Sequence, residues 1–102
     1  MFDADLMEPR IAQAARLMEM LSQPARLKIL CILSQGEQTV QSLADTAGLS
    51  QPAMSHHLRK LREAALVDTR REAQKIHYRL KGDEVKAILD TLYALYCADP
   101  QA

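Results

Sequence analysis

Apolar side chains recur every three or four residues along most of the chain, which is the spacing of one face of an α-helix. The first such stretch runs from residue 7 to residue 21. Its apolar positions are Ile11, Ala14, Ala15, Met18 and Leu21. Pro24 then suits the first turn of a second helix, which extends to about Ser34. This second helix is apolar on two sides, and such helices are normally buried.

Two shorter helices follow, joined by a short turn. Thr39 is a good N-cap for a helix that reaches Ala47, and Gly48 is the residue type that commonly ends a helix. Ser50 caps the next helix, which has Pro52 in its first turn. The sequence "GLS" therefore separates two helices by the distance typical of a helix-turn-helix.

The periodicity changes after Leu66. From residue 67 to residue 80 the pattern alternates, which predicts a hairpin of two short strands with its tip near residues 72–75. A last helix starts at Gly82-Asp83 and reaches about Cys97. Its apolar stripe consists of Val85, Ile88, Leu89, Leu92 and Tyr96. The order predicts a mainly α fold with a small β-hairpin, namely a winged helix-turn-helix with an additional helix at each end.

The helix after Ser50 has one apolar and one polar face. At 100° per residue, four apolar side chains fall within about 60° of one another and form the predicted buried stripe. They are Met54, Leu58, Leu61 and Ala65. The opposite face carries Pro52, His56, Arg59, Lys60 and Glu63, with Ser55 and Arg62 beside it. The basic side chains of this helix are therefore expected to point to solvent.

The 102 residues fit one domain and carry no net charge, but the charge is unevenly distributed. Residues 50–82 hold eight Lys or Arg and three Asp or Glu, a local charge of +5. Residues 1–20 and 83–102 carry local charges of −2 and −3. A basic segment between acidic ends is typical of a protein that binds a polyanion on one face. Charge alone leaves open the alternative of ordinary solvated helices.

An outward helix with a polar, basic front fits the major groove of DNA. Its first two turns offer hydrogen-bonding side chains to base edges, and Arg59 and Lys60 suit phosphates. The hairpin adds basic side chains for the flanking backbone or the minor groove. The candidate DNA-binding residues are Ser50, Gln51, Ser55, His56, Arg59, Lys60, Arg70, Arg71 and Lys75. A merely solvated amphipathic helix is the alternative, and the turn and hairpin in the same order argue against it.

Three stretches together carry a family resemblance: "LSQPARLKILCIL", "LADTAGLSQPAMSHHLRKLREAALV" and "RREAQKIHYRL". They resemble the ArsR family (ArsR/SmtB) of small dimeric bacterial repressors, over nearly the whole chain. The resemblance implies one winged helix-turn-helix domain over residues 1–102 and a homodimer built on the first and last helices. It also implies double-stranded operator DNA read by the helix from Ser50 to Ala64. Apolar stripes on both terminal helices fit the dimer, because one small domain buries such stripes poorly.

Members of this family differ in their sensing site. The metal site of the family's third helix needs Cys-x-Cys, which "EQTVQSLAD" over residues 37–45 lacks. The site of the last helix needs Asp-x-His, whereas this chain has Asp83-Glu84-Val85. His56 and His57 diverge by about 100° on a helix, and His57 lies at the edge of the buried stripe as a packing residue. We therefore expect no metal and no cofactor.

Two cysteines remain, Cys31 and Cys97. From the residues alone, Cys31 between Leu30 and Ile32 fits a simple buried thiol, whereas Cys97 falls off the apolar stripe near the chain end, where exposure is expected. In the family, "KILCIL" and "ALYCADP" resemble the BigR/SqrR/HlyU-like branch, which has a cysteine at each place. That resemblance implies thiolate attack on persulfides or peroxides, followed by a disulfide or polysulfide bridge between Cys31 and Cys97.

The longest apolar run, residues 29–33, is far shorter than the ~20 residues of a membrane span, and the acidic N-terminus lacks a signal-peptide pattern. We therefore expect a cytoplasmic protein with no membrane partner. The expected function is a dimeric DNA-binding regulator, a repressor, controlled by reactive sulfur species or oxidants. The alternatives are a regulator without a thiol switch, an activator that displaces another repressor, and a metal sensor. No Cys-x-x-Cys or Gly-rich loop supports an enzyme.

Overall fold

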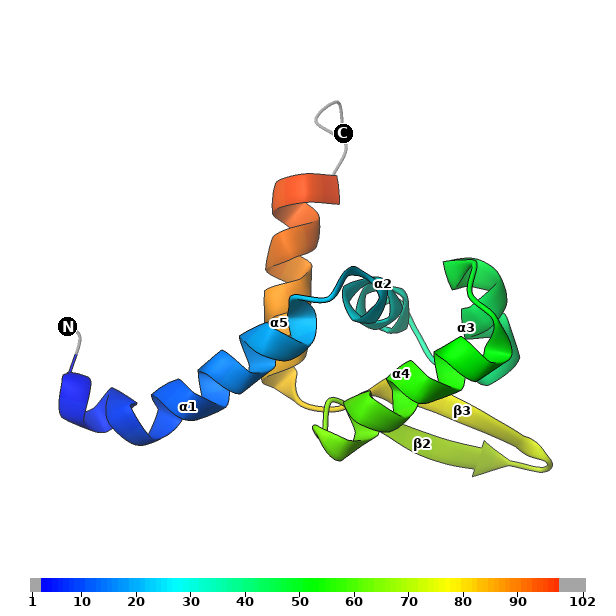
Figure 1. Ribbon diagram of the computed structural model, residues 1–102, viewed down its shortest axis with the longest axis horizontal. Coiled ribbons are helices and arrows are strands. Elements are labelled where there is room, and N and C mark those ends of the chain that lie inside the picture. The colour runs from blue at the N-terminus through cyan, green and yellow to red at the C-terminus, as the bar shows by residue number, and fades with distance from the viewer. Residues whose placement is uncertain (1–2, 98–102) are drawn as a thin grey trace.

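The computed structural model describes residues 3–97, apart from the side chain of Met7 (Figure 1). Its helices are α1 (Ala4–Leu21), α2 (Pro24–Leu33), α3 (Val40–Ala47), α4 (Gln51–Glu63) and α5 (Asp83–Leu92), which continues into the π-helical turn η1 (Tyr93–Cys97). Its strands are β1 (Gln38–Thr39), β2 (Val67–Glu72) and β3 (Lys75–Leu80). The predicted fold class, a mainly helical winged helix-turn-helix, is confirmed.

Side-chain caps place the ends of the helices. The Thr39 hydroxyl accepts a hydrogen bond from the Ser42 N–H at 3.2 Å, and the Ser50 hydroxyl accepts one from the Ala53 N–H at 3.2 Å. Gly48 follows α3 with φ of 72°, a left-handed conformation that glycine adopts at little cost. The turn between α3 and α4 is therefore set by the residues that predicted it.

The sheet has one strand that the alternating pattern did not reveal. Strands β2 and β3 form the predicted hairpin, with Glu72 opposite Lys75 at its tip. Strand β1 pairs antiparallel with β3, Gln38 opposite Tyr78, so that the strand order is β1-β3-β2. A strand of two residues is too short to show an alternation, but it joins the loop after α2 to the hairpin.

The core lies where α2, α3, α4 and the start of α5 meet the base of the sheet. Its largest fully buried side chains are Ile29, Leu30, Leu43, Met54, Leu58, Leu61, Val85 and Leu89. The prediction that Ala65 belongs to the buried stripe of α4 is wrong. The helix ends before that residue, and Ala65 is exposed with φ of 60°.

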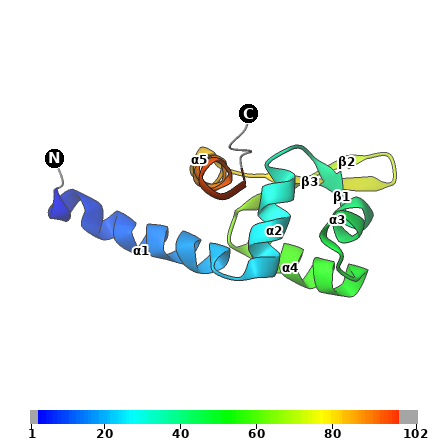
Figure 2. The same cartoon turned by 90° about the horizontal axis from the view of Figure 1, so that it is seen from above.

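The two terminal helices differ in how much of their apolar surface the protomer covers. Helix α1 projects away from the body (Figures 1 and 2), and its Ile11 and Met18 are 44% and 47% exposed. Val85 and Leu89 of α5, in contrast, are buried in the protomer's own core. The expectation that this whole stripe faces a partner is therefore wrong for these two residues, because they belong to the buried core cluster of the protomer itself.

Arg26 on α2 fixes the end of α1. Its Nε donates to the Met20 carbonyl at 2.9 Å and its Nη2 to the Glu19 carbonyl at 3.3 Å. Such bonds satisfy carbonyls that a helix end leaves without partners. Within residues 3–97, none of the helices has the length and hydropathy needed to cross a membrane.

Candidate nucleic-acid interface and thiol pair

Helix α4 presents the predicted polar face to solvent. Met54, Leu58 and Leu61 are buried, whereas every residue predicted to face outward is exposed. Ser55, His56 and Arg59, together with Pro52, line one shallow hollow of about 340 Å³. Arg59 Nη2 lies 3.4 Å from His56 Nδ1. The predicted orientation of α4 is confirmed, and three of its candidate DNA-binding residues lie side by side.

The start of α4 places two further candidates at an exposed helix end. Ser50 and Gln51 are both exposed. The Ser50 hydroxyl oxygen accepts from the Ala53 N–H, so its own hydrogen stays available as a donor. Capping and hydrogen bonding to a ligand are therefore compatible at this residue.

His57, in contrast to His56, is half-buried, as its place at the edge of the stripe predicted. Its Nδ1 is buried without a hydrogen-bond partner. Burial lowers the pKa of His57, and the nearby charges of His56, Arg26 and Lys60 lower it further. The neutral form is therefore favoured, as expected for a packing residue.

The hairpin, or wing, carries an ion-pair network on its polar face. Glu37 accepts hydrogen bonds from Arg70 Nε at 3.0 Å and Arg70 Nη2 at 2.8 Å, and its other oxygen lies 3.7 Å from Arg79 Nη1. Arg70 Nη1 donates to Glu72 at 3.1 Å, and Arg79 Nη2 lies 3.4 Å from Asp68. The hydrogen bond from Arg70 is the main reason why the pKa of Glu37 is lowered.

This network gives Arg70 carboxylate partners that the sequence did not predict, and it includes Glu37, which the sequence did not single out. Arg70 is held by two carboxylates, whereas Arg71 and Lys75 are exposed and form no ion pair within the described residues. Glu37 was missed because its partners lie 33 and 42 residues further along the chain, and only the short β1 brings them together. In both Figures 1 and 2 the wing tip lies at the end of the molecule where α4 begins.

The two cysteines lie on elements that are distant in sequence. Cys31 is half-buried on α2, and Cys97 is exposed in η1. Burial raises the pKa of the Cys31 thiol, and the negative charge of the Cys97 thiolate raises it further. Among residues 3–97, no three His, Cys, Asp or Glu side chains converge as a metal site.

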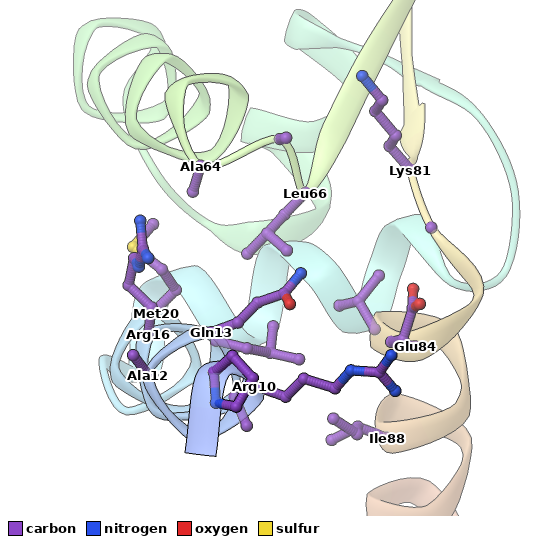
Figure 3. Close-up of a pocket in the computed structure, with 16 residues that line it drawn as sticks. Arg10, Ala12, Gln13, Arg16, Met20, Ala64, Leu66, Lys81, Glu84 and Ile88 are labelled. Carbon is purple, nitrogen blue, oxygen red and sulfur yellow. The ribbon is translucent and has the colours of Figure 1, made fainter. Parts of the chain in front are cut away.

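A groove separates α1 from the wing base and α5 (Figure 3). Its volume is about 1080 Å³. Its apolar lining includes Leu17 and Met20 of α1, Leu66, and Val85 and Ile88 of α5. Its charged lining residues are Arg10, Arg16, Lys81 and Glu84, and Arg10 reaches across the groove toward α5. The exposed Ile11 and Met18 of α1 are not among the residues that line this groove.

The comparisons with known proteins agree with this geometry. Residues 23–69, from the start of α2 into β2, match the model of the family described as "Bacterial regulatory protein, arsR family". The biofilm growth-associated repressor of Agrobacterium fabrum is 46% identical over 90% of this chain and 79% of its own length. The chain belongs to the arsR family. The family resemblance seen in the sequence is thereby confirmed.

Two further relatives bear on the assignment. The transcriptional activator HlyU of Vibrio cholerae is 44% identical over 89% of this chain and 84% of its own length. Its structure in the reduced form has a TM-score of 0.86 at 43% identity, covering 90% of this chain and 97% of that one. A homodimeric winged helix-turn-helix DNA-binding domain from Mycobacterium bovis has a TM-score of 0.76 at 29% identity, covering 93% and 86%. The chain is a DNA-binding transcriptional regulator, not an enzyme.

Proposed function

We propose that this arsR-family regulator binds operator DNA as a homodimer through α4 and the wing, and releases it when Cys31 and Cys97 are oxidised. The DNA surface is supported by the exposed polar face of α4. There Gln51, Ser55 and His56 are suited to base edges, and Arg59 and Lys60 to phosphates. At the tip of the wing, Arg71 and Lys75 add basic charge. We propose that the protein acts as a repressor, as the name of the Agrobacterium relative describes that protein.

The homodimer is supported by apolar surface that the protomer leaves uncovered. Ile11 and Met18 of α1 are exposed, and the groove between α1 and α5 includes the apolar side chains of Leu17, Met20 and Ile88 in its lining. A second copy that brings its own α1 and α5 against these surfaces would remove them from water. The Mycobacterium bovis relative is described as homodimeric. Two copies of α4 would then reach two half-sites about one helical turn apart, ~34 Å.

The thiol switch is supported by the placement of one half-buried thiol, Cys31, and one exposed thiol, Cys97, and by the charge of Cys97, which helps to raise the pKa of Cys31. Cys97 is exposed, so an oxidant meets it first, whereas burial keeps Cys31 protonated. The Cys97 thiolate attacks an organic persulfide, takes up its outer sulfur and releases the organic thiolate. Cys31, deprotonated as it attacks, then displaces hydrosulfide and closes a disulfide. With a peroxide, the Cys97 thiolate is oxidised to a sulfenic acid and the peroxide is reduced to the alcohol or water. Cys31 then attacks the sulfenic sulfur, closes the disulfide and releases the sulfenic oxygen as water.

A bond between the two sulfurs ties η1 to α2, which packs directly against α3 and α4. Because both half-sites are bound at once, a small change in the spacing of the two α4 helices weakens both contacts. Coupling between two such sites is typically ~1–3 kcal/mol, which corresponds to a 5–150-fold loss of operator affinity.

The experiment compares operator binding by reduced and persulfide-treated protein, with the operator duplex selected from a random library. We expect the treated protein to bind the operator about 5- to 150-fold more weakly than the reduced protein. Its intact mass should show a Cys31–Cys97 link. Cys31→Ser and Cys97→Ser should each bind like the reduced parent before and after treatment.

Three results would count against the switch. A double Cys→Ser variant that responds like the parent would place the sensor elsewhere. A parent that binds DNA but ignores oxidants would favour a regulator without a thiol switch. Release by zinc in place of oxidants would favour a metal sensor.

A further inference from the structure

The polar face of the wing is electrically balanced. Side chains alternate between the two faces of a strand, so Asp68, Arg70 and Glu72 of β2 share one face. Across the hairpin they stand opposite Arg79, His77 and Lys75, respectively. Glu37 directly precedes Gln38, which pairs with Tyr78, and so reaches Arg79 from the other side. The face thus holds three carboxylates and three Lys or Arg side chains, whose formal charges cancel.

All three guanidinium nitrogens of Arg70 already donate to carboxylates in this arrangement, which uses three of its five N–H groups. Nε and Nη2 donate to Glu37, and Nη1 donates to Glu72. A DNA phosphate that approached the two remaining N–H groups of Arg70 would be repelled by the carboxylates of Glu37 and Glu72. Arg71, the next residue, points to the other face of β2 and forms no ion pair within the described part of the chain.

Glu37 is the residue that connects this face to the body of the protein. It lies in the loop between α2 and β1 and binds one arginine from each strand of the hairpin. Apart from β1, which has only two residues, this carboxylate is the side-chain polar link between that loop and both strands within residues 3–97. The loop itself is held to the end of α2 by the bonds from the Gln35 and Gly36 N–H groups to the Ile32 and Leu33 carbonyls.

We propose that Glu37 and Arg70 are positioning residues that hold the wing at the angle needed for DNA binding, and that Arg71 and Lys75 make the wing's phosphate contacts. This proposal rests on the proposed function, in which α4 and the wing bind operator DNA. It reverses the expectation from sequence for Arg70, which counted that residue among the DNA contacts.

The test measures operator affinity by fluorescence anisotropy over a range of KCl concentrations. The variants are Glu37→Gln, Arg70→Gln, the double variant Glu37→Gln/Arg70→Gln, and Arg71→Gln as the matched control one residue away. The double variant has the same net charge as the parent, so a general change of protein charge cannot alter its salt dependence. Thermal unfolding of each variant checks that the fold is intact.

Each single variant at Glu37 or Arg70 should bind about 2- to 5-fold more weakly, because exposed ion pairs are individually modest. The double variant should bind no more weakly than either single variant, and it should keep the parent's slope of log affinity against log salt. Arg71→Gln should lower the magnitude of that slope by about 0.9, the value for one lost phosphate contact.

Several outcomes would overturn the positioning role. The first two are tighter operator binding by Glu37→Gln, and operator binding by both single variants that equals that of the parent. The other two concern the double variant: a salt slope that falls as much as in Arg71→Gln, or a loss of affinity equal to the sum of the two single losses. If instead Arg59→Ala and Arg71→Gln leave the slope unchanged, the proposed DNA surface itself is wrong. The positioning proposal and the proposed function can therefore fail separately.

Discussion

At the scale of single residues, His57 couples the stability of the fold to pH. Its pKa is lowered chiefly by burial, and Nδ1 is buried without a partner. The side chains that face it are His56 and Lys60 from α4 and Arg26 from α2, and each adds positive charge. Protonation of His57 therefore favours the unfolded chain, in which the imidazole is hydrated and has its ordinary pKa.

The sign of the pH dependence follows from this lowered pKa. The imidazole of His57 binds a proton more readily in the unfolded chain than in the folded protein. The free energy of unfolding is therefore highest above about pH 6.5, and it falls as the pH drops below that value. Urea denaturation at a series of pH values measures the effect. His57→Gln should flatten the profile, whereas the matched variant His56→Gln at an exposed position should keep the larger part of it, because burial is the main cause of the lowered pKa of His57. Equal profiles for His57→Gln and the parent would exclude His57 as the cause.

The residues of α4 divide into those that hold DNA and those that select its sequence. Arg59→Ala or Lys60→Ala should weaken binding to all sequences and reduce the salt slope by about 1, because each removes one phosphate contact. Gln51→Ala or His56→Ala should instead change the preferred operator, as measured by selection from a random library. Unchanged affinity and preference in all four variants would contradict this division.

At the scale of elements, the turn from α4 to β2 depends on an alanine in a left-handed conformation. Ala65 has φ of 60°, which costs an L-residue roughly 1–2 kcal/mol. Replacement by glycine removes this strain but adds freedom to the unfolded chain, worth roughly 0.5–1 kcal/mol. Ala65→Gly should therefore stabilise the protein by about 0.5–1 kcal/mol, as measured by urea denaturation.

Gly48 is the matched control for that turn. It has φ of 72°, and a Cβ at this position would meet no atom within 4 Å. Gly48→Ala should therefore destabilise the protein through backbone strain alone, by about 1 kcal/mol. Two changes of the same sign would show that left-handed strain does not decide stability at these turns.

The success of the sequence-based prediction differs between elements for physical reasons. Helices α2 to α4 were predicted because their signals are local: Pro24, Thr39, Gly48 and Ser50 act on their immediate neighbours. Strand β1 and the Glu37 network were not, because both depend on partners more than 30 residues away. The burial of Val85 was misjudged because periodicity identifies an apolar face without saying which surface covers it.

At the scale of the whole molecule, the exposed stripe of α1 predicts how the dimer can be separated without loss of the fold. Met18 is 47% exposed in the protomer, whereas Leu89 is 1% exposed. Met18→Glu should place an unpaired charge in the proposed dimer seam and yield a folded monomer. Leu89→Glu should place one in the core and unfold the chain. Analytical ultracentrifugation and circular dichroism distinguish the two results, and a dimeric Met18→Glu protein would contradict the proposed seam.

The projection of α1 has a consequence for how the regulator responds to its own abundance. Every described side chain between residues 3 and 16 is exposed in the protomer. A helix of this length without a packing surface is marginal in water, so α1 should be ordered only when a second copy covers it. Because two copies must associate before two half-sites can be bound, operator occupancy should rise roughly with the square of the amount of chain at low expression. A twofold change in gene dosage would then produce a steeper than proportional change in the regulated transcript.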